Sequence, residues 1–373
     1  MTPLPRGARR RVAESSVYAP VRMVAFSVFI PAYNGAEFLS GAIESVRAQT
    51  YSGWELLIGD NASEDDLAAV VATFDDPRIR YERFDRYVDI FANFNRTMAL
   101  CRHPWVYLLP VDDRLAPTCL ARIAETIEAS RGGRRPLAMV VTAARRVGVD
   151  GRSVEVDYYG VQGPGHIDTG VYDAHDWLLA ACAPGSPPWG CGAYNRKIVE
   201  SMGSFYSEVD PSMSADLELT LRIAAYGDVA YIDEPLLAVT GWSESHTQGR
   251  AGRNRARGER QTTEGAAFVS ALRVHEARRA VSTEERRAVH AAVARSYLRR
   301  AAAHRYRQDG RGRPGALVDL VRGARSSPRT MLAPRSLIRS VAIVLAPARA
   351  LAWVRRRALD RRAAAGARTS SSD

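Results

Sequence analysis

Lysine is scarce and paired cysteines are absent in this sequence of 373 residues. Lys197 is its only lysine, so arginine carries nearly all of the positive charge. The four cysteines form no CxxC pair, and no histidine stands at the spacing of a zinc site; they are Cys101, Cys119, Cys182 and Cys191. These absences argue against a disulfide framework and a zinc module, and they predict ordinary thiols in a reducing compartment.

Long apolar runs are also missing. Residues 1–21 include basic side chains with no apolar segment behind them, so we expect no signal peptide and a cytoplasmic protein. In the tail, residues 331–373, the longest uncharged run is Ser340 to Ala348, far below the roughly 20 residues that a membrane span needs. Its mixture of apolar residues and arginines is typical of a helix on an anionic membrane surface, which would make the protein peripheral on the inner face of the cell membrane. A helix packed on its own domain is the alternative.

Charge divides the chain into two parts. The net charge is +11, but residues 1–249 sum to about −9 and residues 250–373 to about +20. The apolar share of 46% and the charged share of 25% are those of a globular protein. We therefore predict a flexible arm (1–21), an acidic globular domain (22–249), a basic helical extension (250–330) and an arginine-rich amphipathic tail (331–373).

Strand and helix patterns alternate through the acidic domain. The run "VRMVAFSVFIPAYNG" predicts a strand, "AEFLSGAIESVRAQTY" a helix, and "WELLIGD" a second strand. The alternation continues as far as "WVYLLPVDD", with Ser63 expected to cap the helix that follows it in the chain. This order predicts an α/β fold with a mainly parallel sheet flanked by helices, in which ligands bind at the carboxyl ends of the strands. The loops that hold Tyr33, Asp60 and Asp112 are the expected site.

Two adjacent carboxylates, Asp112 and Asp113, follow the apolar run "VYLLPV". Like charges repel, and their desolvation is unfavourable unless a cation or hydrogen-bond donors compensate. Hard cations such as Mg²⁺ and Mn²⁺ bind carboxylate oxygens and, in phosphate chemistry, often use one or two protein carboxylates together with substrate phosphates. A solvated polar turn is the alternative for a bare pair of aspartates.

The order of motifs resembles glycosyltransferase family 2, the inverting nucleotide-sugar transferases of GT-A fold. The segment "SVFIPAYNGAEFLSGAIESVRAQTYSGWELLIGDNASEDD" is similar to the opening βαβ unit of that family. The segment "NRTMALCRHPWVYLLPVDD" is similar to its helix and metal-binding acidic motif, and "ADLELTLRIAAYGDVAYIDEPL" to the part that holds the catalytic base. The resemblance spans residues 25–245 and leaves the basic extension outside.

The resemblance implies a donor site at the strand ends. Its base pocket would be lined by Pro31, Ala32 and Tyr33. Asp60 would accept a hydrogen bond from the nucleobase, with capping of the next helix as its alternative role. Asp112 would bind the ribose and, with Asp113, would hold Mg²⁺ or Mn²⁺ on the diphosphate, where the metal offsets the charge that develops as the glycosidic bond breaks.

Four further residues complete the expected site. Asn95 begins the helix motif and is expected near the nucleotide sugar. Trp189 and Gly192, in "PPWGCG", are expected at the sugar wall, because aromatic rings stack on sugars and glycine permits close approach; core packing is the alternative for Trp189. His246, after the last strand, is expected as a metal ligand, although a lone histidine is more often structural or solvent-facing.

Asp216 is the expected general base. It would take the proton from an acceptor hydroxyl as that oxygen attacks the anomeric carbon from the face opposite the nucleotide. A first-turn helix carboxylate is its alternative role, compatible with the first, and Glu218 is the second candidate for the base. Ala215 replaces the first member of the acidic pair that relatives have here.

Pro110 stands where many relatives have an aspartate. This departure leaves open which of Asp112 and Asp113 contacts the metal directly.

The predicted function is therefore a metal-dependent, hexosyltransferase-like inverting glycosyltransferase. Its substrates would be a nucleoside diphosphate sugar and a hydroxyl acceptor on a lipid-linked or cell-envelope glycan, the acceptor class resting on the tail. One alternative is a nucleotidyltransferase acting on a sugar phosphate, but "PAYNGAEF" lacks the glycines and lysine of a phosphate loop. Another is nucleic-acid binding through the basic extension, which has no recognition motif; no nucleic-acid partner is expected.

Overall fold

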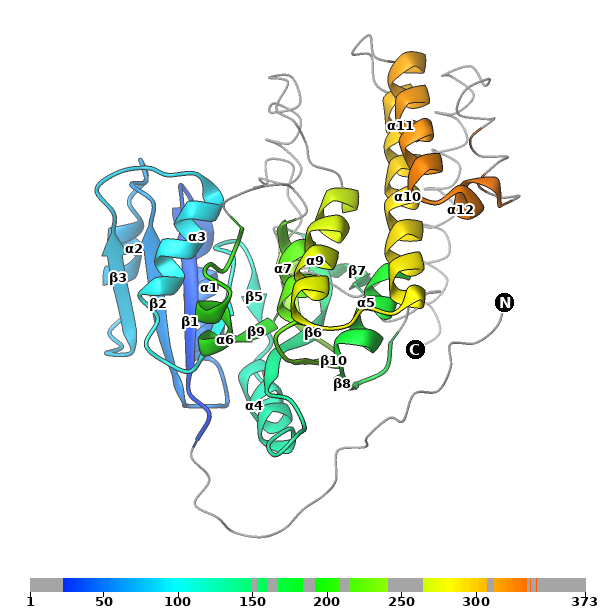
Figure 1. Ribbon diagram of the computed structural model, residues 1–373. Coiled ribbons are helices and arrows are strands. Elements are labelled where there is room, and N and C mark those ends of the chain that lie inside the picture. The colour runs from blue at the N-terminus through cyan, green and yellow to red at the C-terminus, as the bar shows by residue number, and fades with distance from the viewer. Residues whose placement is uncertain are drawn as a thin grey trace, which may run out of the picture. The chain divides into compact units, whose positions relative to one another are not determined.

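The computed structural model of the chain describes residues 23–148, 153–159, 167–183, 192–207, 215–240, 264–306, 312–333, 336 and 340. These residues form two compact units. The first contains the described residues up to 240 together with Val274–Ala280, and the second contains 264–273 and the described residues from Val281 onward. The first unit is α/β and the second is helical (Figure 1).

A ten-stranded sheet forms the centre of the first unit. Eight of its strands follow the order β3-β2-β1-β4-β9-β6-β10-β5, while β7 pairs with β6 and β8 with β10. Its parallel part comprises β1 (Phe26–Ala32), β2 (Trp54–Asp60), β3 (Ile79–Arg83) and β4 (Trp105–Leu108). The remaining strands are β5 (Arg114–Leu115), β6 (Leu137–Val147), β7 (Ser153–Tyr159), β8 (Gly170–Tyr172), β9 (Gly192–Asn195) and β10 (Asp228–Thr240). The predicted parallel order holds for the first four strands. Beyond β4 the sheet is mixed, because β9 runs antiparallel to both β4 and β6.

Helices cover both faces of the sheet. Every residue of β1 and β2 is buried, as expected for parallel strands with helices on each side. One hydrophobic core lies under α1 (Ala36–Arg47), α2 (Leu67–Ala72) and α4 (Cys119–Ala129). The other lies under α3 (Ile90–Ala99), α5 (Ala174–Cys182), α6 (Arg196–Ser201) and α7 (Ala215–Ile223). Asp66 caps α2 through a hydrogen bond from the Ala69 amide, so the expectation that Ser63 is the cap is wrong.

Helix α7 begins on the side of the sheet where the parallel strands end. It leads through a short turn into β10, which is parallel to β6. Strand β9 lies between β4 and β6 and is antiparallel to both, so β4, β6 and β10 all run in the same direction. A helix that feeds a strand by a short turn runs back along the sheet, so its first residue lies toward the carboxyl ends. The Trp177 indole donates to the Thr220 carbonyl at 3.1 Å, and His275 of α9 (Glu264–Arg278) donates to the Leu221 carbonyl at 2.8 Å.

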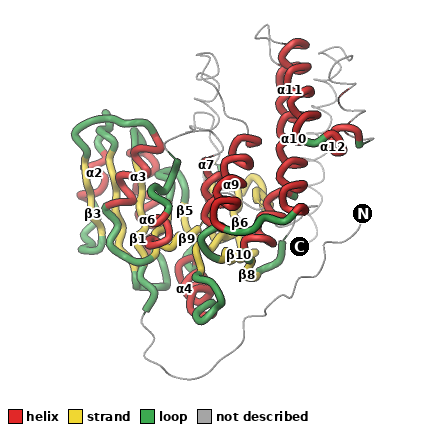
Figure 2. Tube along the Cα trace, in the orientation of Figure 1, coloured by secondary structure: helices red, strands yellow, loops and turns green. Residues whose placement is uncertain are grey.

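The second unit confirms the predicted helical extension. Its other helices are α10 (Thr283–Tyr306), α11 (Gly312–Ser326) and α12 (Pro328–Leu332) (Figure 2). A small core of Ala294, Leu298 and Met331 joins them, and Gly323 lets α11 approach α10, since a Cβ there would lie 3.3 Å from the Ala294 carbonyl oxygen. In the described part of the chain, no helix is both long and apolar enough to cross a bilayer.

Candidate active site

The carboxyl ends of three parallel strands lie side by side. The register pairs Ala32 at the end of β1 with Asp60 at the end of β2, and Asp60 with Arg83 at the end of β3. The Asn61 amide continues this edge by donating to the Ala32 carbonyl at 2.9 Å. The structure thus brings together the loops after β1 and β2, two of the three that the sequence predicted, and it adds the end of β3.

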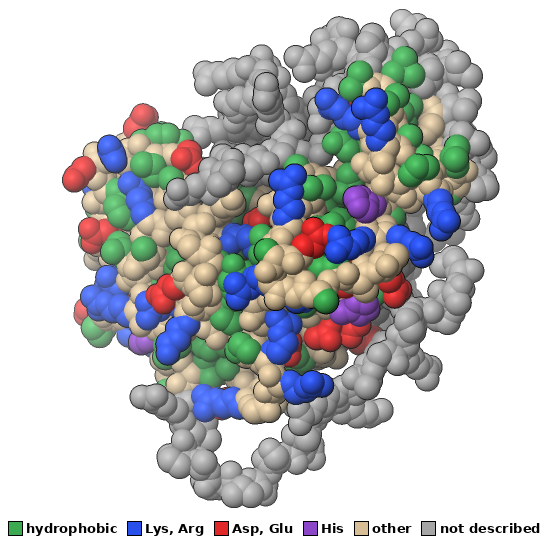
Figure 3. Space-filling view, in the orientation of Figure 1, with side chains coloured by type: hydrophobic (Ala, Val, Ile, Leu, Met, Phe, Trp, Pro, Cys, Tyr) green, Lys and Arg blue, Asp and Glu red, His purple; other side chains and the backbone are tan. Residues whose placement is uncertain are grey.

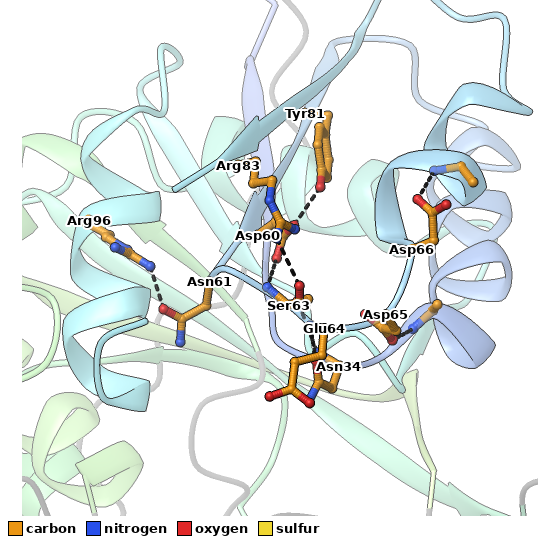
Figure 4. A network of polar contacts seen from close by, with 12 residues as sticks. Asn34, Asp60, Asn61, Ser63, Glu64, Asp65, Asp66, Tyr81, Arg83 and Arg96 are labelled. Atoms are coloured by element: carbon orange, nitrogen blue, oxygen red, sulfur yellow. Dashed lines mark hydrogen bonds and ion pairs between the residues drawn. The ribbon is translucent and has the colours of Figure 1, made fainter. Parts of the chain in front are cut away.

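Asp60 is fully buried and saturated with hydrogen bonds. Its Oδ1 accepts from the Ser63 amide at 2.8 Å, and its Oδ2 accepts from the Tyr81 hydroxyl at 2.6 Å and from the Arg83 guanidinium at 2.5 Å (Figure 4). Burial would raise the pKa of Asp60, but the hydrogen bonds from Ser63, Tyr81 and Arg83 together outweigh it and hold the pKa below its usual value. Asp60 is therefore a carboxylate, and half-exposed Arg83 is the member of this group nearest to solvent.

The loops after β1 and β2 are joined by side-chain hydrogen bonds. Asn34, which has a positive φ of 50°, accepts from the Glu64 amide at 2.8 Å and donates its own amide to the Ser63 hydroxyl at 3.1 Å. Asp65 accepts from the Ala36 amide in the first turn of α1 at 2.7 Å. The half-buried Tyr33 projects from this braced loop.

A pair of aromatic rings forms one wall beside this edge. Tyr87, 54% exposed, lies with its ring centroid 4.8 Å from that of Tyr33. The Asn61 side chain holds the Tyr87 loop by pairing with both backbone groups of Val88, each at 2.9 Å. Arg96 of α3 donates to Asn61 Oδ1 at 2.5 Å, so three elements converge to place the two tyrosines.

The acidic turn, Asp112 and Asp113, lies between β4 and β5. It packs against the loop after β1, because a Cβ on Gly35 would come within 2.8 Å of Val111. The Oδ1 atom of buried Asp113 accepts from the Thr240 amide at the end of β10, at 2.9 Å. Burial, and then the neighbouring Asp112, raise the pKa of Asp113 well above its usual value.

The donor set at the acidic turn fits a hard cation in part. Two carboxylates stand together, one buried and one half-buried. Elsewhere in the described residues, and at this turn, no group of three or more His, Cys, Asp or Glu side chains is arranged to hold a metal. Since Mg²⁺ and Ca²⁺ take about six oxygen ligands or more, a metal at this turn would need substrate oxygens and water to complete its shell.

Asp216 lies in the first turn of α7, and the Tyr206 hydroxyl donates to its Oδ1. Its side chain reaches solvent, yet the surrounding protein is dense enough that desolvation raises the pKa of Asp216, against the opposing effect of the Tyr206 hydrogen bond. The carboxyl therefore occupies a crowded position with an opening on one side. Glu218 is buried and paired with Arg222 at 2.9 Å, which makes it a poor alternative base.

Asn95 lies next to Tyr206 in the structure. Its side chain accepts from the Tyr206 amide at 2.8 Å and donates to the Tyr206 carbonyl at 3.0 Å. Gly192 begins β9, where a Cβ would collide with the backbone of Val140 in β6, so close strand packing accounts for this glycine. The predicted residues Trp189 and His246 lie outside the described residues.

Several residues of the site were not predicted. Tyr81 and Arg83 are two positions apart on β3, so they share a face, and the alternation of a strand next to Asp60 was a signal that could have identified them. Asn61, Arg96 and Tyr206 gave no such signal, because their roles depend on loops that meet only in the folded chain.

A family model matches the part of the chain that contains the predicted donor site. The model described as glycosyl transferase family 2 matches residues 27–137, which contain Tyr33, Asp60 and the acidic turn. This part of the chain is similar to glycosyl transferase family 2. The resemblance drawn from the sequence motifs is confirmed.

Two curated proteins and a solved structure are also similar to this chain. The succinoglycan biosynthesis protein ExoO of Rhizobium meliloti is 32% identical over 34% of this chain and 35% of its own length. The Escherichia coli protein UDP-Glc:alpha-D-GlcNAc-diphosphoundecaprenol beta-1,3-glucosyltransferase WfgD is 43% identical over 14% of this chain and 21% of its own length. The chain thus spans about a third or less of these curated relatives.

The solved structure of Staphylococcus aureus TarS 1–349 in complex with UDP superimposes with a TM-score of 0.61 at 13% identity, covering 90% of this chain and 92% of that one. This likeness shows the fold, which is GT-A as predicted.

Proposed function

We propose that this protein is an inverting glycosyltransferase of family 2 that moves a sugar from a nucleoside diphosphate donor to a hydroxyl acceptor. The observation that carries the proposal is the convergence of three acidic positions on one side of the sheet. Asp60 ends β2, the acidic turn packs on the loop after β1, and Asp216 lies in the first turn of α7, which leads into β10. Nothing in an inverting displacement requires a protein nucleophile, and one base is enough.

Each group has a distinct task in this proposal. The tyrosine wall and the Asp60–Arg83 pair would bind the nucleobase, with the guanidinium donating to base carbonyl oxygens. Asp112 and Asp113 would hold Mg²⁺ or Mn²⁺, which when bound stabilises the leaving diphosphate. Asp216 would take the proton of the acceptor hydroxyl, and its opening to solvent leaves room for that group.

The donor class is tested by a thermal-shift screen. The protein is heated with UDP, GDP, CDP, ADP or dTDP, each with Mn²⁺ and with EDTA. One nucleoside diphosphate is expected to raise the Tm by several degrees, because a ligand at about 100 times its Kd stabilises the folded state by about 2.7 kcal/mol. UDP is the expected one, since the names of WfgD and of the TarS complex contain UDP.

A shift that survives EDTA would contradict the metal assignment. A shift with nucleoside triphosphates but with no diphosphate would favour the nucleotidyltransferase, and no shift with any nucleotide would contradict the donor site altogether.

We also propose that the acceptor is lipid-linked and that the second unit binds the membrane. Most of the tail lies outside the described residues, but α11 presents an apolar face to solvent. This outer face consists of Leu317, Val318 and Val321, 47%, 49% and 50% exposed, flanked by exposed Arg322 and Arg325. Basic and apolar side chains share the surface over α10 and α11 in Figure 3.

Charge favours an anionic bilayer as the occupant of this face. Asp319 of α11 is 1% exposed and lies 3.6 Å from the Arg322 guanidinium, so the described side chains on the outer face are apolar residues and arginines. Arginines beside apolar side chains can reach anionic headgroups while their neighbours enter the interface. The acceptor named for WfgD, a diphosphoundecaprenol, is a lipid.

Vesicle sedimentation tests the membrane proposal. The protein is expected to bind phosphatidylglycerol vesicles and not phosphatidylcholine vesicles, and the variant L317E/V321E should bind about tenfold more weakly. V171E is the matched control, since Val171 is an exposed apolar residue of β8 in the first unit. Equal binding by both variants contradicts this face as the docking surface. A change from dimer to monomer in L317E/V321E by light scattering would instead make it an interface between copies.

A further inference from the structure

We infer that Tyr206 is a positioning residue for the general base: it orients the Asp216 carboxyl so that one oxygen faces the acceptor hydroxyl. This inference rests on the proposed role of Asp216. Three observations carry it: how the Tyr206 backbone is held, how its ring is enclosed, and where its hydroxyl points.

Two polar side chains hold the backbone on either side of the ring. Asn95 of α3 pairs with both the amide and the carbonyl of Tyr206, at 2.8 and 3.0 Å. Arg222 of α7 donates to the Phe205 carbonyl at 2.8 Å, and the buried Glu218 in turn fixes Arg222. The described segment after α6, residues 202–207, is thus tied to α3 on one side and to α7 on the other.

Three rings enclose the Tyr206 side chain. The ring centroids of Phe91, Phe94 and Phe205 lie 5.3, 5.4 and 4.9 Å from that of Tyr206. Tyr206 is 1% exposed, so its two side-chain torsions have little freedom. Its hydroxyl is therefore delivered to a defined place, and the acceptor there is Asp216 Oδ1.

The hydrogen bond distinguishes the two oxygens of the base. Oδ1 is engaged by Tyr206, and among the described residues no hydrogen bond to Oδ2 is present. Because the side chain reaches solvent, Oδ2 is the oxygen that can accept the proton of an incoming hydroxyl. A phenol that donates to the carboxylate also favours its charged form, the form that a base needs.

Helix α3 links this arrangement to the donor side. Adjacent residues reach in two directions: Asn95 to the loop that carries Tyr206, and Arg96 to Asn61 and the loop that carries Tyr87. One rigid helix therefore sets both the base and the aromatic wall. In the sequence, the same Asn95 was expected to bind the sugar nucleotide directly.

The experiment compares Y206F with a matched tyrosine variant. Y51F is the control, because it also removes a tyrosine hydroxyl that donates a hydrogen bond, here to the Val24 carbonyl at 2.7 Å, on the amino side of β1. UDP release from UDP-N-acetylglucosamine and from UDP-glucose is measured with Mn²⁺ from pH 5 to 9. Y206F is expected to lower kcat about 10- to 100-fold with KM for the sugar nucleotide unchanged, and Y51F to leave both unchanged.

The pH profile separates positioning from a loss of structure. Burial raises the pKa of Asp216 and the Tyr206 hydrogen bond lowers it, so removing the hydroxyl raises it further. Activity disappears as pH falls through this pKa, and the acid limb of Y206F should therefore lie at higher pH than that of the wild type. A limb that does not move would overturn the inference.

Unfolding gives a readout that needs no substrate. Y206F should lower the Tm of the wild type more than that of D216A, because alanine removes the acceptor oxygen that an asparagine would keep. Equal effects in the two backgrounds would overturn the inference even if neither sugar nucleotide is turned over. The activity of D216N tests the two proposals separately. An active D216N refutes Asp216 as the general base. An inactive D216N, together with a Y206F whose activity and pH profile match those of Y51F, refutes only the role of Tyr206.

Discussion

Replacing Asp216 by asparagine is expected to lower sugar transfer about a thousandfold or more while donor binding stays unchanged. Asparagine has nearly the same shape and can still accept the Tyr206 hydrogen bond through Oδ1, so the fold of α7 should persist. Its amide cannot take a proton from an acceptor hydroxyl at neutral pH. The loss should therefore appear in kcat and not in KM for the donor.

The measurement pairs initial rates with calorimetric titration of the donor nucleotide in Mn²⁺. D176N is a fitting control, because Asp176 is also an exposed first-turn aspartate, on α5, and burial likewise raises its pKa. D176N should keep wild-type rates. If D216N stays active, the base lies elsewhere, and the buried Glu218–Arg222 pair would have to open to supply it.

The fold was predictable from the sequence where strands are buried by helices on both faces of the sheet. Strands β1, β2 and β4 are apolar runs that end abruptly at polar loops, which is why the positions of Tyr33, Asp60 and Asp112 could be read in order. The arrangement of the later strands was not predictable, because β9 has four residues and its antiparallel entry between β4 and β6 leaves no trace in the sequence pattern. Strand direction depends on contacts far apart in the chain.

The sequence predicted the carboxylates of the site, but not the hydrogen-bond network around them. Motif order pointed to Asp60 and Asp216, yet the groups that set their charge, Arg83 and Tyr206, come from other elements. Asn95 illustrates the difference. An asparagine side chain offers one donor and one acceptor group, which matches the two backbone groups of a single residue, and here that residue is Tyr206.

The double substitution D112N/D113N is expected to abolish the Mn²⁺-dependent stabilisation by UDP and to lower transfer about a thousandfold. The acidic turn would then lack both carboxylates that bind the cation, and the negative charge of the leaving diphosphate would not be neutralised. The substitution is isosteric, and an asparagine at 113 can still accept from the Thr240 amide, so β5 and β10 should remain joined.

Without metal, the substitution of Asp113 is expected to raise the stability of the fold, although it lowers activity. Asp113 is 5% exposed and adjoins Asp112, and two neighbouring carboxylates removed from water repel each other and lose hydration. D113N should therefore raise the Tm in EDTA by a few degrees while lowering activity, the pattern of a functional site that is maintained at the expense of stability. D75N, at an exposed aspartate after α2, should change neither quantity. A D112N/D113N protein that still shows the Mn²⁺-dependent shift with UDP would place the metal away from this turn, and a D113N that is less stable in EDTA would mean that hydrogen bonding, not repulsion, dominates there.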